Sequence, residues 1–282
     1  MDWTTLLSLA GMGFAAGTIG AMLGIGGGVF VVPFLSLVLH LPMHVAIGTS
    51  LVAVVANSSA TSTAYVKKRL TNIRLGVLLE STMVAGAIVG ALVAVVVQAN
   101  ILSALFGAAL VYAACSMGMR EAERGAGETL VGGIDVFKSP LAAGYYDHYL
   151  QKAISYSPAR IPLGLVVNFF AGNLAGLLGI GGGIVQVPLL NLLLGVPMKA
   201  AVATSSFSLG VTGASSCLVY FSQGYLYPLI IAPVVIGVFL GTQLGTQLAQ
   251  RVKGLILRRI FAGVLFLVAI PMVLKAFNIA LP

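Results

Sequence analysis

Two short glycine-rich stretches hold the residues whose types and spacing are best suited to bind a ligand. Residues 24–33 read GIGGGVFVVP and residues 179–188 read GIGGGIVQVP. A glycine triplet breaks a helix and has no Cβ to keep a ligand away, and the helix that starts after it directs free N–H groups and a positive dipole end at the break. This chemistry suits an anion. The predicted binding residues are Gly26, Gly27, Gly28, Gly181, Gly182 and Gly183.

Close packing of helices is the alternative explanation for glycines in apolar runs. The triplets differ from packing glycines because each is followed by a run of about 12 residues, too short to cross a bilayer upright. We therefore predict broken or re-entrant helices at both triplets. Pro33 and Pro188 are expected early in the short segments, where a missing N–H costs little. The glycines that we assign to packing instead are Gly13, Gly17, Gly86 and Gly90.

Polar residues at the start of the third apolar segment of each half form a second candidate group. Their hydroxyls and amides can donate to sulfonate or carboxylate oxygens, but they can equally bond carbonyls of their own helix or join two helices. The Thr-Ser pair recurs in both halves, whereas Asn57 and Gln186 occur in one half only, as an asymmetric substrate requires. The predicted substrate-binding residues of this group are Thr49, Ser50, Asn57, Thr204 and Ser205, and Gln186 of the second glycine-rich stretch is predicted with them.

Ionisable side chains are rare in the apolar runs. Glu80 is the only acid within one, about a turn from a basic loop, where it would pair with Arg74 or Lys67. An acid at membrane depth is also a candidate proton site, as are His40 and His44 near the first broken segment. The sequence offers no pair of buried acids, no nucleophile–base triad and no metal cluster, so we expect no enzymatic activity, no cofactor and no metal.

The composition places these residues in a membrane. The chain of 282 residues is 59% hydrophobic and 8% charged, with a mean hydropathy of +1.06. The apolar runs of about 17 to 23 residues suit helices that cross a bilayer, and they lack the alternation of barrel strands. The net charge of +8 lies in basic residues between these runs, which indicates membrane topology and contact with lipid headgroups rather than nucleic acid.

The chain contains an internal repeat with an offset of 155 residues and no gap. Gly24 corresponds to Gly179 and Tyr65 to Tyr220, and the match covers roughly residues 13–117 and 168–272. We divide the chain into a first transmembrane repeat (1–117), a linker (118–160) and a second transmembrane repeat (161–282). The linker holds ten charged side chains, and we expect a short helix in it near residues 147–154.

The charges of the short loops indicate that the two repeats are inverted. In the first half, the loop between the third and fourth apolar segments is basic and the next loop is uncharged; in the second half this order is reversed. Because basic short loops stay in the cytoplasm, we expect both termini outside and the linker inside. The basic residues of these loops are Lys67, Lys68, Arg69, Arg74, Arg251, Lys253, Arg258 and Arg259.

The doubled Gly-Ile-Gly-Gly-Gly-x-x-x-Val-Pro motif, followed by the stretch Ala201-Val202-Ala203-Thr204-Ser205, resembles the TauE/SafE sulfite exporter family, also called the toluene-sulfonate uptake permease family. This resemblance covers both halves. It implies a multi-pass carrier in the inner (plasma) membrane for small sulfur-containing anions such as sulfite or organosulfonates. Members include exporters and importers.

The sequence thus predicts an all-α integral membrane transporter of two inverted repeats of about five segments each. The anion would bind between the two breaks, and one repeat would rock against the other in alternating access. A passive anion channel and a carrier for a non-sulfur organic anion are the alternatives. The anion, the direction of transport, the coupling ion, the role of the linker and a homo-oligomeric state stay open.

Overall fold

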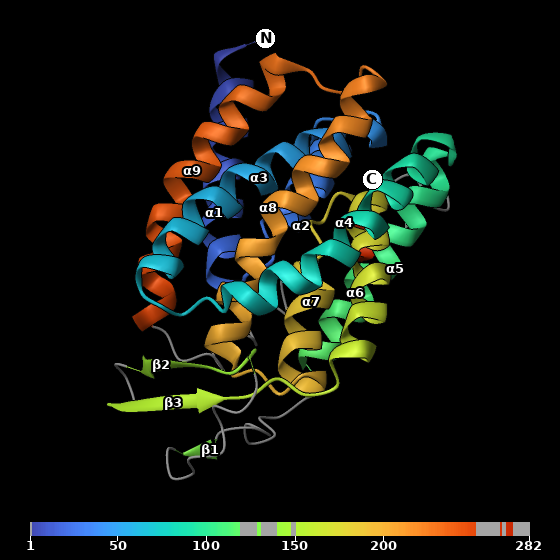
Figure 1. Ribbon diagram of the computed structural model, residues 1–282. Coiled ribbons are helices and arrows are strands. Elements are labelled where there is room, and N and C mark those ends of the chain that lie inside the picture. Colours follow the sequence, from blue (N-terminus) through green and yellow to red (C-terminus); the bar gives the residue numbers. More distant parts are fainter. Residues whose placement is uncertain are drawn as a thin grey trace.

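The computed structural model describes residues 2–118, 129–130, 140–147, 151–251, 266 and 269–272. Helices account for most of this part of the chain (Figure 1). Six of them are long and apolar enough to cross a membrane, as the runs of apolar residues predicted. The expected last segment, near residues 255–277, lies mostly outside the described residues.

The helix bounds confirm the repeat of 155 residues. In the four matched pairs, both the first and the last residue are displaced by that offset. The first half contains α1 (Trp3–Leu23), α2 (Gly28–Pro33), the π-helical turn η1 (Phe34–Val38), α3 (Met43–Lys67), α4 (Ile73–Val96) and α5 (Ala99–Gly118). The second half contains α6 (Ile161–Leu178), α7 (Gly183–Pro188), the π-helical turn η3 (Leu189–Leu193), α8 (Met198–Ser222) and α9 (Pro228–Arg251). The matched pairs are α2 with α7, η1 with η3, α3 with α8 and α4 with α9.

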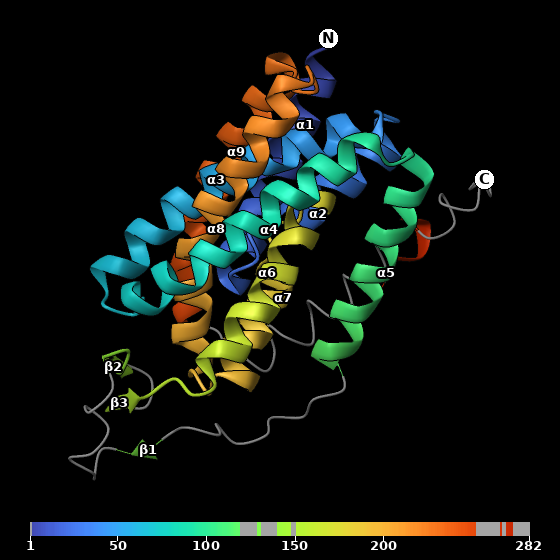
Figure 2. The ribbon, with the colours of Figure 1, turned by 45° about the vertical axis from the view of Figure 1, so that its right-hand side comes forward.

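The two halves interleave instead of packing as separate units. Helix α1 packs along α9, and α6 packs along α4, so the first helix of each half lies against the fourth helix of the other half (Figures 1 and 2). Helices α3 and α8 pack on each other between these two pairs. In both views α1 starts at the end of the bundle away from the strands and α6 starts beside them, which is consistent with inverted repeats.

Glycines make these two helix pairs possible, as predicted for the Gly-x-x-x-Gly spacings. A Cβ on Gly13 or Gly17 would lie 2.4 or 2.3 Å from the carbonyl oxygen of Val234 or Val238 in α9. In the other pair, a Cβ on Gly90 would lie 2.0 Å from the carbonyl oxygen of Asn173 in α6. Any side chain at these positions would separate the helices. Both pairs therefore rely on direct backbone contact for dispersion energy, because lipid supplies no hydrophobic drive between them.

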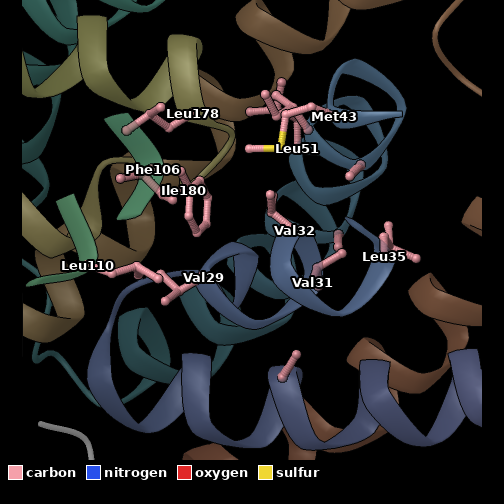
Figure 3. Packing of buried hydrophobic residues seen from close by; sticks show 14 of the residues in the cluster. Val29, Val31, Val32, Leu35, Met43, Leu51, Phe106, Leu110, Leu178 and Ile180 are labelled. Carbon is pink, nitrogen blue, oxygen red and sulfur yellow. The ribbon is translucent and has the colours of Figure 1, made fainter. Parts of the chain in front are cut away.

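Apolar side chains from both halves surround the short helix α2. Val29, Val31 and Val32 belong to a fully buried cluster that includes Phe106 of α5 and Ile180 of the second glycine break (Figure 3). The central position of α2 follows from its sequence, because its side chains are apolar on every face and must be covered by protein.

The linker contains a small antiparallel sheet and corrects one prediction. Strands β2 (Ala143–Asp147) and β3 (Lys152–Tyr156) pair where we expected a helix near residues 147–154, and β1 (Thr129–Leu130) pairs with the other edge of β3. The reason is a period of two: Ile154 and Tyr156 share one buried face of β3, and Ile154 lies opposite Tyr145 of β2.

This sheet lies at the end of the bundle opposite the N-terminus (Figure 1). Tyr145, Ile154 and Tyr156 pack against the ends of α4 and α8. The basic loop before α4 joins the contact: Arg74 donates to the carbonyl of Pro140, and Asn72 donates to that of Leu141. The linker and the basic loop thus share one end of the molecule, as the predicted topology requires.

Candidate functional site

The backbone conformation of the two breaks requires glycine. Helix α1 ends at Gly24 with a φ of 70°, and Gly26 and Gly27 both have a φ of 78°. Gly181 and Gly182 repeat this geometry at 71° and 77°. Side chains disfavour this left-handed region, so the paired glycines allow each chain to leave one helix and start the next within a few residues.

The two breaks contact each other at the centre of the molecule. A Cβ on Gly28 would lie 2.5 Å from the carbonyl oxygen of Gly179, and one on Gly183 would lie 2.4 Å from that of Gly24. The side chain of Val54 in α3 lies against both triplets. The fold therefore brings together two motifs that are 155 residues apart in the sequence.

Two serines join the breaks. Ser50 of α3 donates a hydrogen bond to the carbonyl of Gly179, and Ser205 of α8 donates one to the carbonyl of Gly24 at 3.1 Å. Each serine thus satisfies the last turn of the helix that precedes the opposite break. Because their hydroxyl protons are engaged in this conformation, Ser50 and Ser205 hold the two backbones together here, and they are not free donors for an anion.

The helices that start after the breaks carry unpartnered N–H groups. No hydrogen bond among the described residues uses the N–H of Gly28 or Val29, and the same holds for Gly183 and Ile184. With their π-helical turns, these helices extend from Gly28 to Val38 and from Gly183 to Leu193. Each break thus ends at the positive end of a helix of 11 residues.

The positions of Pro33 and Pro188 differ from the prediction. Each is the sixth residue of its helix and lies outside the first turn, where the interior of an α-helix would lose a hydrogen bond. The π-helical turn begins at the next residue in both halves. Its backbone hydrogen bonds join residues five apart instead of the four of an α-helix, as when the Leu39 N–H donates to the carbonyl of Phe34 at 3.3 Å. The wider turn accommodates the proline without ending the helix.

All twelve predicted site residues are buried, and three of them have polar atoms without a hydrogen-bond partner among the described residues. These atoms are Thr49 Oγ1, Asn57 Nδ2 and both amide atoms of Gln186. Thr204 differs from Thr49, because its hydroxyl accepts a hydrogen bond from the N–H of Asn72 at 3.0 Å. Unsatisfied buried polar atoms are costly and rare, so the Nδ2 atom of Asn57, which lies against the first break, points to a ligand.

Asn57 is directed at the first break. Its Nδ2 lies 2.6 Å from the place of a Cβ on Gly20 and 3.4 Å from the place of one on Gly27. Its Oδ1 faces the hydroxyls of Thr61 at 2.8 Å and Thr242 at 3.2 Å, and each hydroxyl has a shorter contact with a backbone carbonyl, of Asn57 at 2.6 Å and of Val238 at 2.7 Å. The NH₂ group is on the side of the glycines and has no hydrogen-bond partner among the described residues.

The second break has a different side-chain environment. Thr212 takes the place of Asn57 in the repeat, and Met83 takes the place of Val238. The Met83 methyl lies 2.2 Å from where a Cβ on Gly182 would be. Sequence reasoning missed Met83 and Thr242 as parts of the site. Their sequence positions offered a signal. Met83 lies one helical turn before Gly86 on the packing face of α4, and Thr242 follows Gly241 on the packing face of α9.

Glu80 does not form the ion pair that the sequence suggested. Its Oε1 accepts a hydrogen bond from Thr212 at 2.6 Å, and its Oε2 has no partner in the part of the chain that the structure describes. Arg74 binds the carbonyl of Pro140 instead, and Lys67 is exposed. The predicted pairing fails because Glu80 lies seven residues into α4, on the face toward α8, while the basic side chains stay at the helix end.

The two candidate histidines lie just before and at the start of α3, and His44 contacts the end of α4 that is far from Glu80. His40 is exposed. His44 is in contact with the carbonyl of Ala94 at 3.0 Å and stacks on Tyr225 at a centroid distance of 5.1 Å. Within the described ranges, neither histidine is in contact with the glycine triplets. Among the described residues, no three His, Cys, Asp or Glu side chains come together as a metal site.

Comparison with known proteins agrees with these features. A family model described as Sulfite exporter TauE/SafE matches residues 9–272. The Probable membrane transporter protein YunE of Bacillus subtilis is 31% identical over 232 residues, which are 79% of this chain and 81% of that protein. A Probable membrane transporter protein of Methanocaldococcus jannaschii is 29% identical over 228 residues, 77% of this chain and 73% of that protein. Sulfite exporter TauE/SafE family protein 3 of Arabidopsis thaliana is 34% identical over 76 residues, 27% of this chain and 16% of that protein. No solved structure matches this chain.

Proposed function

This chain belongs to the TauE/SafE sulfite exporter family of membrane transporters, and from this premise we propose that it is a secondary transporter of small sulfur-containing anions in the inner membrane. The name of the family supports the substrate class, and the names of the bacterial and archaeal relatives support transport. The inner-membrane location follows the basic short loops that indicate a cytoplasmic side.

The observation that carries the proposal is the contact of two broken helices whose first N–H groups have no hydrogen-bond partner among the described residues. Helix starts at membrane depth hold anions in transporters through N–H donors and the helix dipole. Asn57 Nδ2 adds a free side-chain donor to the first break. In this proposal the anion accepts hydrogen bonds from the backbone N–H groups of the triplets and from the side chains of Thr49, Asn57 and Gln186.

The serines and Thr204 have a supporting role in this conformation. Ser50 and Ser205 hold the opposite carbonyls, and Thr204 holds the start of α4 through Asn72. We expect them to keep the two breaks in register, and to donate to the anion only in a state in which the breaks move apart.

Alternating access remains the proposed mechanism, but the moving parts follow the interleaved helices. Because α1 is packed backbone to backbone on α9, and α6 on α4, whole repeats cannot separate without breaking both contacts. We propose that the α1–α9 pair and the α4–α6 pair shift as units about α3 and α8. The burial of all twelve site residues favours a carrier over a passive channel, which would keep an open path.

The first experiment is the thermal stability of the purified protein against a panel of anions at matched ionic strength. The panel contains sulfite, thiosulfate, sulfate, sulfoacetate, taurine and simple carboxylates. An anion at a hundred times its dissociation constant stabilises the protein by about 2.7 kcal/mol, which gives a clear rise in Tm. We expect this rise with sulfur oxyanions or sulfonates. A rise with carboxylates alone would overturn the substrate class, and single-channel currents in planar bilayers would overturn the carrier.

A further inference from the structure

The carboxyl group of Glu80 lies deep inside the helical bundle. Glu80 follows the first residue of α4 by seven positions, about 10 Å along the helix at 1.5 Å per residue. Its partner Thr212 is near the middle of α8, which spans Met198–Ser222. Only 7% of Glu80 is exposed. The sequence suggested a shallow position near the basic loop, whereas the contact with the middle of α8 places the carboxyl at the depth of the glycine breaks.

Among the residues that the structure describes, no basic side chain forms an ion pair with this carboxyl group. Helix α6, which packs on α4, contains no ionisable residue in Ile161–Leu178. On α4 itself Arg74 binds Pro140, and on α8 the titratable groups are Lys199 in the first turn and Cys217 and Tyr220 toward the far end. The hydrogen bond that Glu80 Oε1 accepts at 2.6 Å comes from a neutral hydroxyl, that of Thr212.

Protonation of Glu80 would remove the free-energy cost of burying an unpaired carboxylate. A buried carboxylate without a cation is expensive, and the Oε2 atom has no donor among the described residues. A proton on Oε2 removes the negative charge and turns this atom into a donor, while Oε1 keeps the hydrogen bond from Thr212. A metal cation is a poorer match, because hard cations require six or more oxygen ligands and only a few are at hand here.

The position of Glu80 connects it to the second break. Met83, one helical turn further along the same face of α4, touches the place of a Cβ on Gly182. In the second half, Val235 of α9 takes the place of Glu80 in the repeat, so the corresponding position of α9 has no acid. A negative charge at Glu80 would repel an anion near the second break, and a neutral carboxyl would not. The charge of Glu80 and the occupancy of the site are therefore coupled.

We propose that Glu80 is a proton-binding site and that its proton travels with the anion. The proton arrives from water on one side, forms an O–H bond at Oε2, and leaves to water on the other side after the anion has gone. No bond of the protein or the anion is broken. This inference rests on the proposed anion transport, and it assigns its coupling: the protein is a proton–anion symporter whose direction is set by the two gradients.

The test separates coupling from transport. Wild type, Glu80→Gln and Glu80→Asp are reconstituted into liposomes, with the membrane potential clamped at zero by valinomycin and equal potassium. The probes are thiosulfate and isethionate labelled with sulfur-35, which both stay fully ionised near neutral pH. With one coupled proton, a tenfold inward proton gradient gives about tenfold accumulation of the probe, since equal gradients balance. Counterflow without a pH gradient measures the exchange of the anion alone.

We expect Glu80→Gln to lose the proton-driven accumulation while it retains counterflow, and Glu80→Asp to retain both. Accumulation by Glu80→Gln equal to that of wild type would overturn the inference. Counterflow by wild type without any response to the pH gradient would also overturn it, and would leave the proposed transport intact. Absence of counterflow with every probe would instead count against the proposed function.

An infrared titration without any anion gives an independent readout. The carbonyl stretch of a protonated carboxylic acid is compared between wild type and Glu80→Gln, with Glu80→Asp as the conservative control. A protonated-acid band that is present in wild type and missing in Glu80→Gln supports proton binding at Glu80, whatever the probes show. Identical spectra across the titration would contradict it.

Discussion

The two glycine breaks have the same backbone and different surroundings. Gly27 and Gly182 have φ values of 78° and 77°, and each break receives one serine hydrogen bond from the opposite half. Around the first break stands an amide donor, Asn57. Around the second stand a thioether, Met83, and beyond it an acid, Glu80.

This comparison shows how a duplicated motif can divide its tasks. Backbone geometry depends on the glycines and on the serines that hold the carbonyls, and these are equal in both halves. The charge of the site depends on single side chains that point at the breaks, and these differ. We therefore assign donation to the anion mainly to the first break and proton binding to the neighbourhood of the second.

The largest expected effect is the loss of transport in Gly27→Val and Gly182→Val. Both positions have a positive φ, which for a β-branched residue costs about 1–3 kcal/mol. At Gly27 the new Cβ also lies 2.7 Å from the carbonyl oxygen of Ala16, whereas at Gly182 it meets the movable methyl of Met83. We expect both variants to reach the membrane without transport, with Gly27→Val the less stable. Flux and membrane content are measured together.

The control for these variants is Gly11→Ala, because nothing lies within 4 Å of a Cβ at Gly11 and this residue is exposed. It should transport as wild type does. Unchanged transport kinetics in both valine variants would contradict the assignment of the breaks as the anion site.

A smaller effect is expected from Asn57→Leu, which removes the free donor at the first break. Loss of one hydrogen bond to a charged ligand is worth about 1.5–3 kcal/mol, so the anion should bind roughly ten- to hundredfold more weakly. The binding constant is obtained by titrating Tm with the anion selected from the panel. Asn191→Ala is the matched control, because Asn191 lies beyond α7 and its amide donates to the carbonyl of Val196 instead. Equal weakening in both variants would show that Asn57 has no special role.

The smallest expected effect is that of Ser50→Ala and Ser205→Ala on stability. Each removes one hydrogen bond between the halves, worth about 1 kcal/mol, so Tm without an anion should fall by a few degrees in each variant. Similar losses would confirm that the serines serve the shared backbone. A loss of anion affinity with unchanged stability would instead show that the serines donate to the substrate. Both breaks would then contribute donors to the anion.

Local chemistry explains why part of this fold could be predicted. Hydropathy and length predicted the helices, the offset of 155 residues predicted matching helix bounds, and the Gly-x-x-x-Gly spacings predicted close crossings such as that of Gly90 with Asn173. Each of these rests on interactions within a short segment or on the absence of a Cβ, so the residue type alone decides it.

Other features depend on which segments become neighbours. The linker sheet was missed because the pairing of β2 with β3 satisfies their backbone groups only once both strands are present. Glu80 was expected beside basic residues that are close in sequence, but the crossing of α4 with α8 turns its carboxyl toward Thr212.

The residue pattern determined that the helices break at two glycine triplets, since only glycine populates a positive φ freely and a run of about 12 apolar residues cannot span a bilayer. Only the tertiary structure decided that the two breaks touch and that Ser50 and Ser205 donate to carbonyls of the opposite half. It also decided that α1 packs on α9 and α6 on α4, each against a helix of the other half. The physical reason is range: a φ preference acts within one residue, whereas these contacts require segments more than 80 residues apart in sequence, as Gly90 and Asn173 are, to pack at backbone distance.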